Sequence, residues 1–464
     1  MKMMNPQDRL IVKYTVLLTL TMSLFATKQA AAEKQAPWNV LFIAVDDLNH
    51  WVGYMGRNSQ TLTPNLDKLA ARGVRFNHAY CAAPLCNPSR AAVMSGLRPT
   101  TSGVYDNNED WRTVIPVEQT LTTTFRNAGY QVSGAGKIYH GKYPRRREWD
   151  DYLTNVGSDP VPKGNKGVGG IRFAPLDCAD EDLREWKIVN YGIKKLSTKQ
   201  DQPFFLTIGL HKPHMPWDVP RKYYDLHPLD SIQLPPVRDD DFDDLPESAI
   251  RMAKPDGDHA EILKSGRWKE AVQGYLAAIS YSDAMIGRLI DAYDRSPDRD
   301  RTIIVLWGDH GWHLGEKKHW RKFALWEEAT RTPLIWLVPG LTAENQVCHR
   351  TVDLMSIYPT LTDLCGIPTP RHVEGVSLKP LLENPDSAWN QPALTSYGAG
   401  NHTVRTEKWR YIRYANGDEE LYDEQRDPYE WTNLAADPQF SSKKAELAEF
   451  LPKQIQTPLR LRKK

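Results

Sequence analysis

The sequence contains few cysteines, no excess of charge of either sign and, after residue 32, no long hydrophobic run. Five cysteines among 464 residues are too few for a scaffold held by disulfides, and their odd number leaves at least one unpaired. A formal net charge of +1 excludes a global field that would attract nucleic acid or an anionic membrane. We therefore expect no nucleic-acid partner and no membrane span in the mature protein.

The first 32 residues are organised like an export signal. Lys2, Arg9 and Lys13 precede an apolar stretch over residues 14–26, and residues 30–32 supply small side chains for cleavage. We predict a signal peptide over residues 1–32 and an exported protein, periplasmic or secreted in a bacterium and lysosomal or secretory in a eukaryote. A retained membrane anchor is disfavoured because the apolar stretch is short for a bilayer.

The next part of the chain alternates short apolar runs with helical patterns, an arrangement typical of α/β proteins. The longest helical pattern covers residues 268–293. We therefore predict an α/β domain over residues 33–371, with a large, mainly parallel sheet flanked by helices. The expected strands are residues 39–45, 131–135, 204–209, 302–307 and 334–338.

The last part of the chain has a different pattern. Residues 403–414 and 420–423, joined by the turn at Asn416-Gly417, predict antiparallel strands, and a charged helix is expected over residues 441–451. We assign residues 372–464 to a small C-terminal α+β subdomain. An acidic stretch containing prolines, residues 234–258, predicts a long surface loop.

Acidic residues follow two of the predicted strands, as an acidic pair after one and as an acid beside a histidine after the other. Asp46-Asp47 follows residues 39–45, and Asp309-His310 follows the strand over residues 302–307. Adjacent acids in a loop are commonly solvated, but the carboxyl ends of parallel strands meet at one edge of a sheet. Carboxylates there suit Ca²⁺ or Mg²⁺, although imidazole is not a favoured Ca²⁺ ligand.

Residues 86–90 read Cys-Asn-Pro-Ser-Arg and precede a Ser-Gly pair at residues 95–96. A lone cysteine is usually a small buried hydrophobe. The five-residue pattern at a predicted helix start favours a functional role instead, because amide groups and a guanidinium there stabilise anions. Separate segments with Lys137, His140, His214 and Lys322 supply further groups suited to a negatively charged substrate.

Together these motifs resemble the formylglycine-dependent type I sulfatases of the alkaline phosphatase superfamily, and within them the iduronate-2-sulfatase-like branch. The resemblance spans nearly all of the chain after the signal and implies an alkaline-phosphatase-like fold. The stretches that carry it are residues 46–48, 86–96, 136–140, 211–216, 309–316, 421–423 and 427–430.

The resemblance implies a modified nucleophile and a metal. Cys86 would be converted to formylglycine by a formylglycine-generating enzyme. A Ca²⁺ would be held by Asp46, Asp47, Asp309 and His310 together with the converted Cys86. The pairing of the four remaining cysteines stays open; they are Cys81, Cys178, Cys348 and Cys365.

The same resemblance gives five more side chains roles in catalysis. Arg90 and Lys137 would hold the hydrated aldehyde, and His140 would hydrogen-bond to it. His214 and Lys322 would grip the sulfate, with His214 protonating the leaving oxygen. One hydroxyl of the hydrate would attack sulfur, and the other would later expel sulfate and restore the aldehyde.

We therefore predict a sulfuric ester hydrolase that removes sulfate from a sulfated sugar or polysaccharide, with a 2-O-sulfated uronate as one candidate. Two alternatives stay open: a phosphonate or phosphate ester hydrolase of the same superfamily, and a non-catalytic exported glycan-binding protein. Trp111, Arg112, Trp312 and His313 are candidate substrate contacts, although ordinary loop packing explains them equally well.

Overall fold

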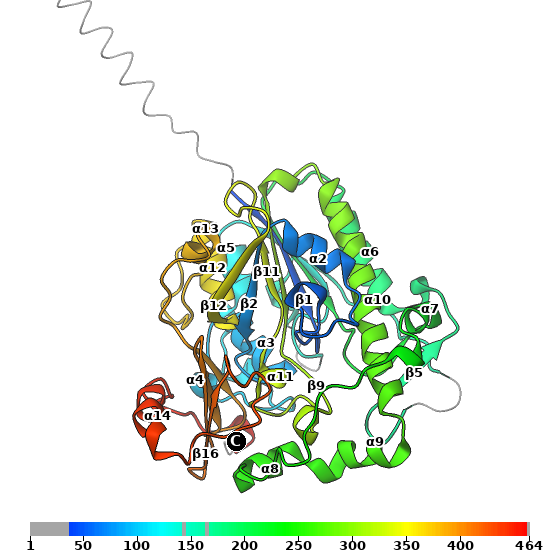
Figure 1. Cartoon of the computed structure of the whole chain (residues 1–464). Coiled ribbons are helices and arrows are strands. Elements are labelled where there is room, and N and C mark those ends of the chain that lie inside the picture. The colour runs from blue at the N-terminus through cyan, green and yellow to red at the C-terminus, as the bar shows by residue number, and fades with distance from the viewer. Residues whose placement is uncertain (1–36, 142–144, 163–166, 462–464) are drawn as a thin grey trace, which may run out of the picture. The chain divides into compact units, whose positions relative to one another are not determined.

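An eight-stranded mixed sheet forms the centre of the computed structural model (Figure 1). The described residues are 37–141, 145–162 and 167–461, so the predicted signal peptide lies outside them. From one edge to the other, the strands are β12 (Gln346–Asp353), β2 (Val74–Tyr80), β11 (Leu334–Leu337), β8 (Thr302–Gly308), β1 (Asn39–Val45), β6 (Phe204–Leu210), β3 (Gln131–Gly136) and β4 (Asp151–Leu153).

The sheet is mainly parallel, as predicted. β8, β1, β6, β3 and β4 form consecutive parallel pairs, whereas β11 runs antiparallel to both of its neighbours. Leu334 at the start of β11 pairs with Trp307 near the end of β8. The chain between them therefore stays at the carboxyl edge and re-enters the sheet from that side, which explains why β11 is reversed.

Alternate residues of β1 pack into two hydrophobic clusters on opposite faces of the sheet. All of β1, β6 and β8 is buried, which explains their continuous apolar sequences. One face is covered by α2 (Pro64–Ala71), α6 (Arg184–Leu196) and α10 (Trp268–Asp294). The other is covered by α3 (Cys86–Ser95), α5 (Leu121–Asn127) and α12 (Ile357–Leu364).

A four-stranded antiparallel sheet follows near the C-terminus, as predicted. Its strands are β13 (Ala393–Ser396), β14 (His402–Arg405), β15 (Trp409–Arg413) and β16 (Glu419–Asp423), and α14 (Ser441–Ala448) packs beside it. The single strand expected over residues 403–414 is two strands, and Gly417 turns the chain between β15 and β16 at a φ of 96°. Residues 38–464 form one compact unit, and the boundary at residue 372 stays a prediction.

The prediction of a long loop over residues 234–258 is wrong in its second half, which contains α8 (Glu247–Ala253). Ala249 and Ala253, one helical turn apart, are buried in a cluster that also contains Trp326 and Tyr414. The helix therefore forms against tertiary partners that its polar sequence does not reveal. The remaining short helices are α4 (Pro99–Ser102), α7 (Arg221–Asp225), α9 (Ala260–Ser265), α11 (Glu327–Thr330) and α13 (Lys379–Glu383).

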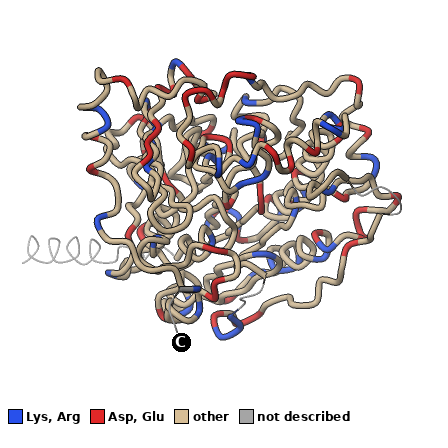
Figure 2. Tube along the Cα trace, turned by 90° about the horizontal axis from the view of Figure 1, so that it is seen from below, with Lys and Arg blue, Asp and Glu red and all other residues tan. Residues whose placement is uncertain are grey.

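Two small sheets lie outside the main one, β5 (Phe173–Leu176) with β7 (Trp217–Pro220) and β9 (His313–Leu314) with β10 (Trp320–Arg321). All five cysteines are free thiols. No described helix combines the length and the apolar character that crossing a membrane requires. Basic and acidic residues are interspersed along the trace in Figure 2, consistent with the small net charge.

Candidate active site

Three parallel strands bring charged side chains to one edge of the central sheet. The ends of β1, β8 and β3 are held in register through direct pairing or through β6. Asp46, Asp309 and Lys137, each the first residue after its strand, therefore meet at the carboxyl edge. All three are buried, so the sheet delivers a dense set of charges to a site screened from water.

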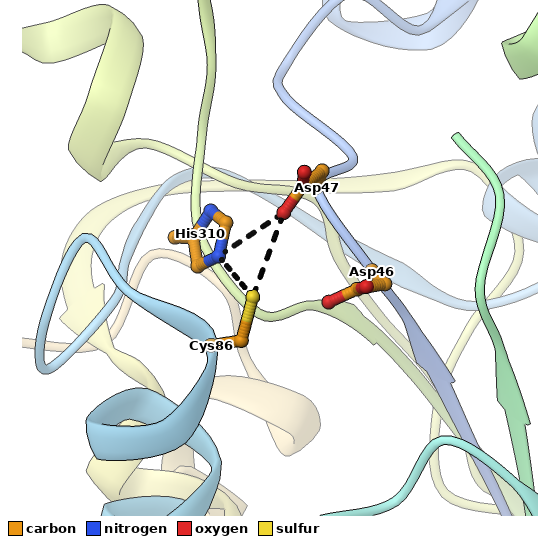
Figure 3. A group of neighbouring side chains, drawn as sticks. All are labelled: Asp46, Asp47, Cys86 and His310. Atoms are coloured by element: carbon orange, nitrogen blue, oxygen red, sulfur yellow. Dashed lines mark hydrogen bonds and ion pairs between the residues drawn. The ribbon is translucent and has the colours of Figure 1, made fainter. Parts of the chain in front are cut away.

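Cys86 is the first residue of α3 and is fully buried beside these strand ends. Its Sγ lies 3.0 Å from Lys322 Nζ, 3.4 Å from His310 Nε2 and 3.8 Å from Asp47 Oδ1. Figure 3 shows the sulfur facing the Asp47 carboxylate and the His310 ring. Three side chains that are distant from Cys86 in sequence thus converge on this one atom.

Asp46, Asp47, Cys86 and His310 form a group that could hold a cation, with one ligand atom from each residue lying within 4.8 Å of the others. Asp47 Oδ2 is buried and accepts no hydrogen bond from any described residue. A buried carboxylate oxygen without a donor is costly unless a cation or another donor is bound. The two carboxylates provide the hard oxygen ligands that Ca²⁺ requires, so the residues fit such an ion.

Asp309, also predicted as a metal ligand, is held by protein groups. Its Oδ2 accepts from Arg90 Nε at 2.8 Å, and its Oδ1 accepts from the backbone amide of Asp47 at 3.0 Å. Its Oδ1 lies 3.5 Å from His310 Nε2. Asp309 therefore positions three neighbours, and its place in a metal's coordination shell stays a prediction.

Arg90 and Lys137 donate hydrogen bonds to carboxylates, and no described hydrogen bond joins either of them to Cys86. Arg90 Nη2 lies 3.2 Å from Asp46 Oδ1, and Lys137 Nζ donates to Asp46 Oδ2. Their predicted contact with a hydrated aldehyde is therefore not seen with an unmodified thiol. Lys322 is the cation that reaches the sulfur, and it also donates to Asp47 Oδ1 at 2.7 Å.

The formal charges of this cluster balance. Three carboxylates of Asp46, Asp47 and Asp309 face three cations, which are Arg90, Lys137 and Lys322. Burial lowers the pKa of His310, so the imidazole is neutral at pH 7. A bound divalent cation would give the cluster a net positive charge, which would attract a sulfate monoester.

Burial raises the pKa of the Cys86 thiol to about 12, with a further contribution from the Asp46 carboxylate. Burial lowers the pKa of His140 and of His214 to about 4 each, with Lys137 adding to the effect on both. Both imidazoles are therefore neutral at pH 7. His214 Nε2 lies 3.8 Å from Asp47 Oδ2, and 37% of its side chain is exposed, so it borders the site on the solvent side.

His140 lines a cavity of about 300 Å³ with Lys137, Arg145, Trp149 and His211. None of the described residues that line this cavity is acidic. It therefore offers a cationic and aromatic space next to the charged cluster around Cys86, which suits an anionic substrate.

Three of the four candidate substrate contacts are buried. Trp111, Trp312 and His313 expose at most 1% of their surface, so none offers a face to a ligand in this structure. Trp111 stacks on Tyr139 instead, with ring centroids 4.6 Å apart. Arg112 is partly exposed, but its guanidinium pairs with Asp110 at 2.8 Å.

The sequence analysis assigned no individual role to Ser89 or Tyr275. Ser89 Oγ donates to the carbonyl of Asp309 at 2.6 Å, and Tyr275 OH donates to the carbonyl of Asp47 at 2.8 Å. Both fix the backbone that presents the carboxylates. The motif at residues 86–90 pointed to Ser89, whereas Tyr275 lies within an apolar helix and resembles any core residue.

The sulfatase family model matches residues 38–367, which is most of the chain. The chain belongs to the sulfatase family. A second model, for the C-terminal part of N-sulphoglucosamine sulphohydrolase, matches residues 315–457. These matches confirm the resemblance to type I sulfatases, so the protein is a sulfuric ester hydrolase.

Named relatives agree with this assignment. The sulfatase is 38% identical to a sulfatase of Formosa agariphila over 95% of this chain and 92% of that protein. It is 30% identical to iduronate 2-sulfatase of Mus musculus over 77% of each chain. A solved phosphonate monoester hydrolase of Agrobacterium radiobacter aligns with a TM-score of 0.75 and 21% identity, covering 89% of this chain and 94% of that one, which shows the shared fold.

Proposed function

We propose that this sulfatase removes sulfate from sulfated sugars, with a formylglycine derived from Cys86 as nucleophile and Ca²⁺ as its metal. The observation that carries the proposal is the buried Cys86 Sγ, which contacts Lys322, His310 and Asp47 at the carboxyl edge of the sheet. Similarity to iduronate 2-sulfatase makes a 2-O-sulfated uronate the first substrate to test.

A formylglycine at position 86 would supply a hydroxyl nucleophile on hydration, and a bound Ca²⁺ would stabilise negative charge on the sulfuryl oxygens. Asp46, Asp47 and His310 would hold that ion, with Asp309 as a further predicted ligand. Arg90 and Lys137 neutralise the carboxylates around it and keep their positions fixed.

Lys322 and His214 would act on the sulfate. Lys322 Nζ is a cation 3.0 Å from the sulfur atom whose place the nucleophile would take, so it can bind a sulfuryl oxygen there. The His214 imidazole is neutral in the free protein, and the negative charge of a bound sulfate ester favours its protonated form. A protonated His214 would then donate its proton to the leaving oxygen.

The alternative of a phosphonate or phosphate ester hydrolase concerns the same cavity and the same cations. The fold shared with a phosphonate monoester hydrolase does not distinguish sulfur from phosphorus as the reacting centre. Rates on matched aryl sulfate and aryl phosphate esters would decide. We expect the sulfate ester to react faster, and a preference for the phosphate ester would contradict the proposal.

The sugar specificity requires a separate comparison. We expect turnover of a 2-O-sulfated uronate disaccharide to exceed that of a disaccharide sulfated only at position 6 of the amino sugar. A reversed order would refute the uronate assignment and leave the sulfatase reaction intact. A non-catalytic glycan-binding role is disfavoured by membership of an enzyme family.

Export and maturation complete the proposal. We propose that residues 1–32 direct the chain out of the cytoplasm, to the periplasm or beyond, and that a formylglycine-generating enzyme modifies Cys86. N-terminal sequencing of the secreted protein should begin at Glu33. A retained first residue would contradict the cleavage.

A further inference from the structure

A second cavity, of about 710 Å³, adjoins the segment that carries Lys322. Arg321 and Phe323, which flank Lys322 in the chain, form part of its wall, while the Lys322 ammonium points to Cys86. The described residues thus form one cavity beside Lys137 and His140 and a larger one against the chain segment that contains Lys322. A volume of this size is ample for a sugar unit of a bound oligosaccharide.

Besides the segment with Arg321 and Phe323, two further parts of the chain form the wall of the larger cavity. The end of α8 and the residues after it contribute Lys254 and Asp258, and the C-terminal sheet region contributes Tyr397 and Tyr414. Figure 1 shows α8 beside the C-terminal strands, and buried residues of both pack in one cluster. The C-terminal region thus lies against the segment that carries Lys322.

Two aromatic rings from distant segments form one side of this cavity. Phe323 and Tyr397 lie with their ring centroids 6.3 Å apart, and both side chains are half-buried. Their remaining exposed faces can cover the apolar C–H face of a sugar ring, which removes apolar surface from water. The arrangement suits a sugar ring with an apolar C–H face better than a compact ion.

The charged wall residues favour an anion. Arg251, Lys254 and Arg321 are cationic, whereas Asp258 is the one carboxylate among the described wall residues. Arg321 is already bound to Asp258 at 2.6 Å, and Arg251 lies 2.5 Å from Glu247. Lys254 has no ion pair with any described residue.

The backbone holds Lys254 in an unusual conformation. Lys254 ends α8 with a φ of 52°, a left-handed value that costs free energy for a residue with a side chain. The left-handed residue ends the helix, and the exposed Lys254 is one of the residues that line the cavity. Without an ion pair to a described residue, the Lys254 ammonium is available to an external anion.

We propose that this cavity binds the sugar unit next to the sulfated one, and that Lys254 contacts a second anionic group on that unit. The proposal rests on the proposed function, because it extends the same substrate beyond its reacting sulfate. The ring would pack against Phe323 and Tyr397, and the carboxylate or sulfate on it would accept from the Lys254 ammonium. The enzyme would thus favour oligosaccharides with adjacent acidic groups.

The test uses two disaccharides with the same 2-O-sulfated uronate, one with an N-sulfated and one with an N-acetylated amino sugar. Replacing Lys254 with Gln should raise KM about 10-fold for the N-sulfated compound and leave kcat unchanged, because a hydrogen bond to a charged group is lost. KM for the N-acetylated compound and for a small aryl sulfate should stay unchanged. Lys254→Arg keeps the charge and should keep most of the affinity.

Lys264→Gln, at an exposed position of α9 outside both cavity walls, is the matched control and should behave like the wild type. Binding of the two disaccharides to Cys86→Ala protein, measured by calorimetry, separates recognition from turnover. Equal affinity of both disaccharides, failure of both to bind, or an unchanged KM in Lys254→Gln would overturn the assignment. A wild-type enzyme that does not hydrolyse the aryl sulfate would instead overturn the proposed function.

Discussion

Cys86 is buried among charged groups rather than among apolar side chains. Its sulfur contacts Lys322, His310 and Asp47, and burial raises the thiol pKa to about 12. The encoded thiol is therefore almost entirely protonated at pH 7 and is a weak nucleophile. The surroundings suit an oxygen nucleophile that acts on an anion better than they suit a cysteine.

Replacing Lys322 with Met should lower kcat on an aryl sulfate by about 100-fold or more, because the cation nearest the reacting atom is lost. Affinity for Ca²⁺ should stay equal or rise, because a positive charge 2.7 Å from Asp47 is removed. Steady-state kinetics and calorimetric Ca²⁺ titration measure the two effects. Lys318→Met, in the same segment, is the control. A kcat of Lys322→Met within about twofold of the wild-type value would contradict a role of Lys322 in binding the sulfuryl group.

At this scale the sequence predicted the residues that meet but not all of their contacts. The convergence of five residues could be predicted, because the strand ends and the helix start that carry most of them were recognisable. These residues are Cys86, Asp46, Asp47, His310 and Lys322. The burial of Trp312 was not predictable, because the ring packs against Trp217 and Tyr275, which come from distant parts of the chain. A buried ring that packs near a lysine and a ring that stacks on a sugar have the same sequence signature.

Among the elements, the segment over Arg146–Glu148 contains a buried acid whose protonation links pH to stability. Glu148 accepts from Thr122 Oγ1 at 2.7 Å and from the Tyr139 hydroxyl. Burial raises its pKa from 4.5 to about 7. The folded protein therefore binds this proton more tightly than the unfolded chain, so the stabilisation is full below about pH 4.5 and is lost as the pH approaches 7.

Glu148→Gln should remove this dependence. We expect the free energy of unfolding to rise by about 1–3 kcal/mol at pH 8 relative to the wild type, with a smaller difference at pH 5. Urea unfolding at the two pH values measures the change. The exposed Glu118→Gln should show no such difference, and equal effects of Glu148→Gln at both pH values would refute the assignment.

The elements were predictable where the pattern was local. β1, β6 and β8 have continuous apolar sequences because they are buried on both faces, and α10 has a long regular helical pattern. The direction of β11 and the existence of α8 depend on where the chain returns and on what it meets there. Neither the direction of β11 nor the existence of α8 can be predicted from the residues of those segments alone.

Across the whole molecule, buried ion pairs join the C-terminal sheet to the rest of the chain. Arg410 on β15 is fully buried, and its guanidinium contacts Glu327 of α11 together with Glu424 and Glu430. Such a network is satisfied only when both parts are in place. It therefore fixes the C-terminal region beside the Lys322 segment.

Arg410→Met should destabilise the protein by about 3–5 kcal/mol, because buried carboxylates lose their partner. Urea unfolding of the folded enzyme measures this loss. The partly exposed pair Arg413–Glu419, 3.4 Å apart on neighbouring strands, provides the control, and Arg413→Met should cost less than about 1 kcal/mol. Similar losses in the two variants would show that the network does not join the two parts.

The most direct test of the account is the chemical state of residue 86 in active enzyme. Mass spectrometry of the peptide that contains residues 86–90, after expression with a formylglycine-generating enzyme, should show an aldehyde in place of the thiol, with activity rising in proportion to conversion. Cys86→Ala protein should fold and be inactive. Full activity from protein whose residue 86 is entirely unmodified cysteine would contradict the central claim.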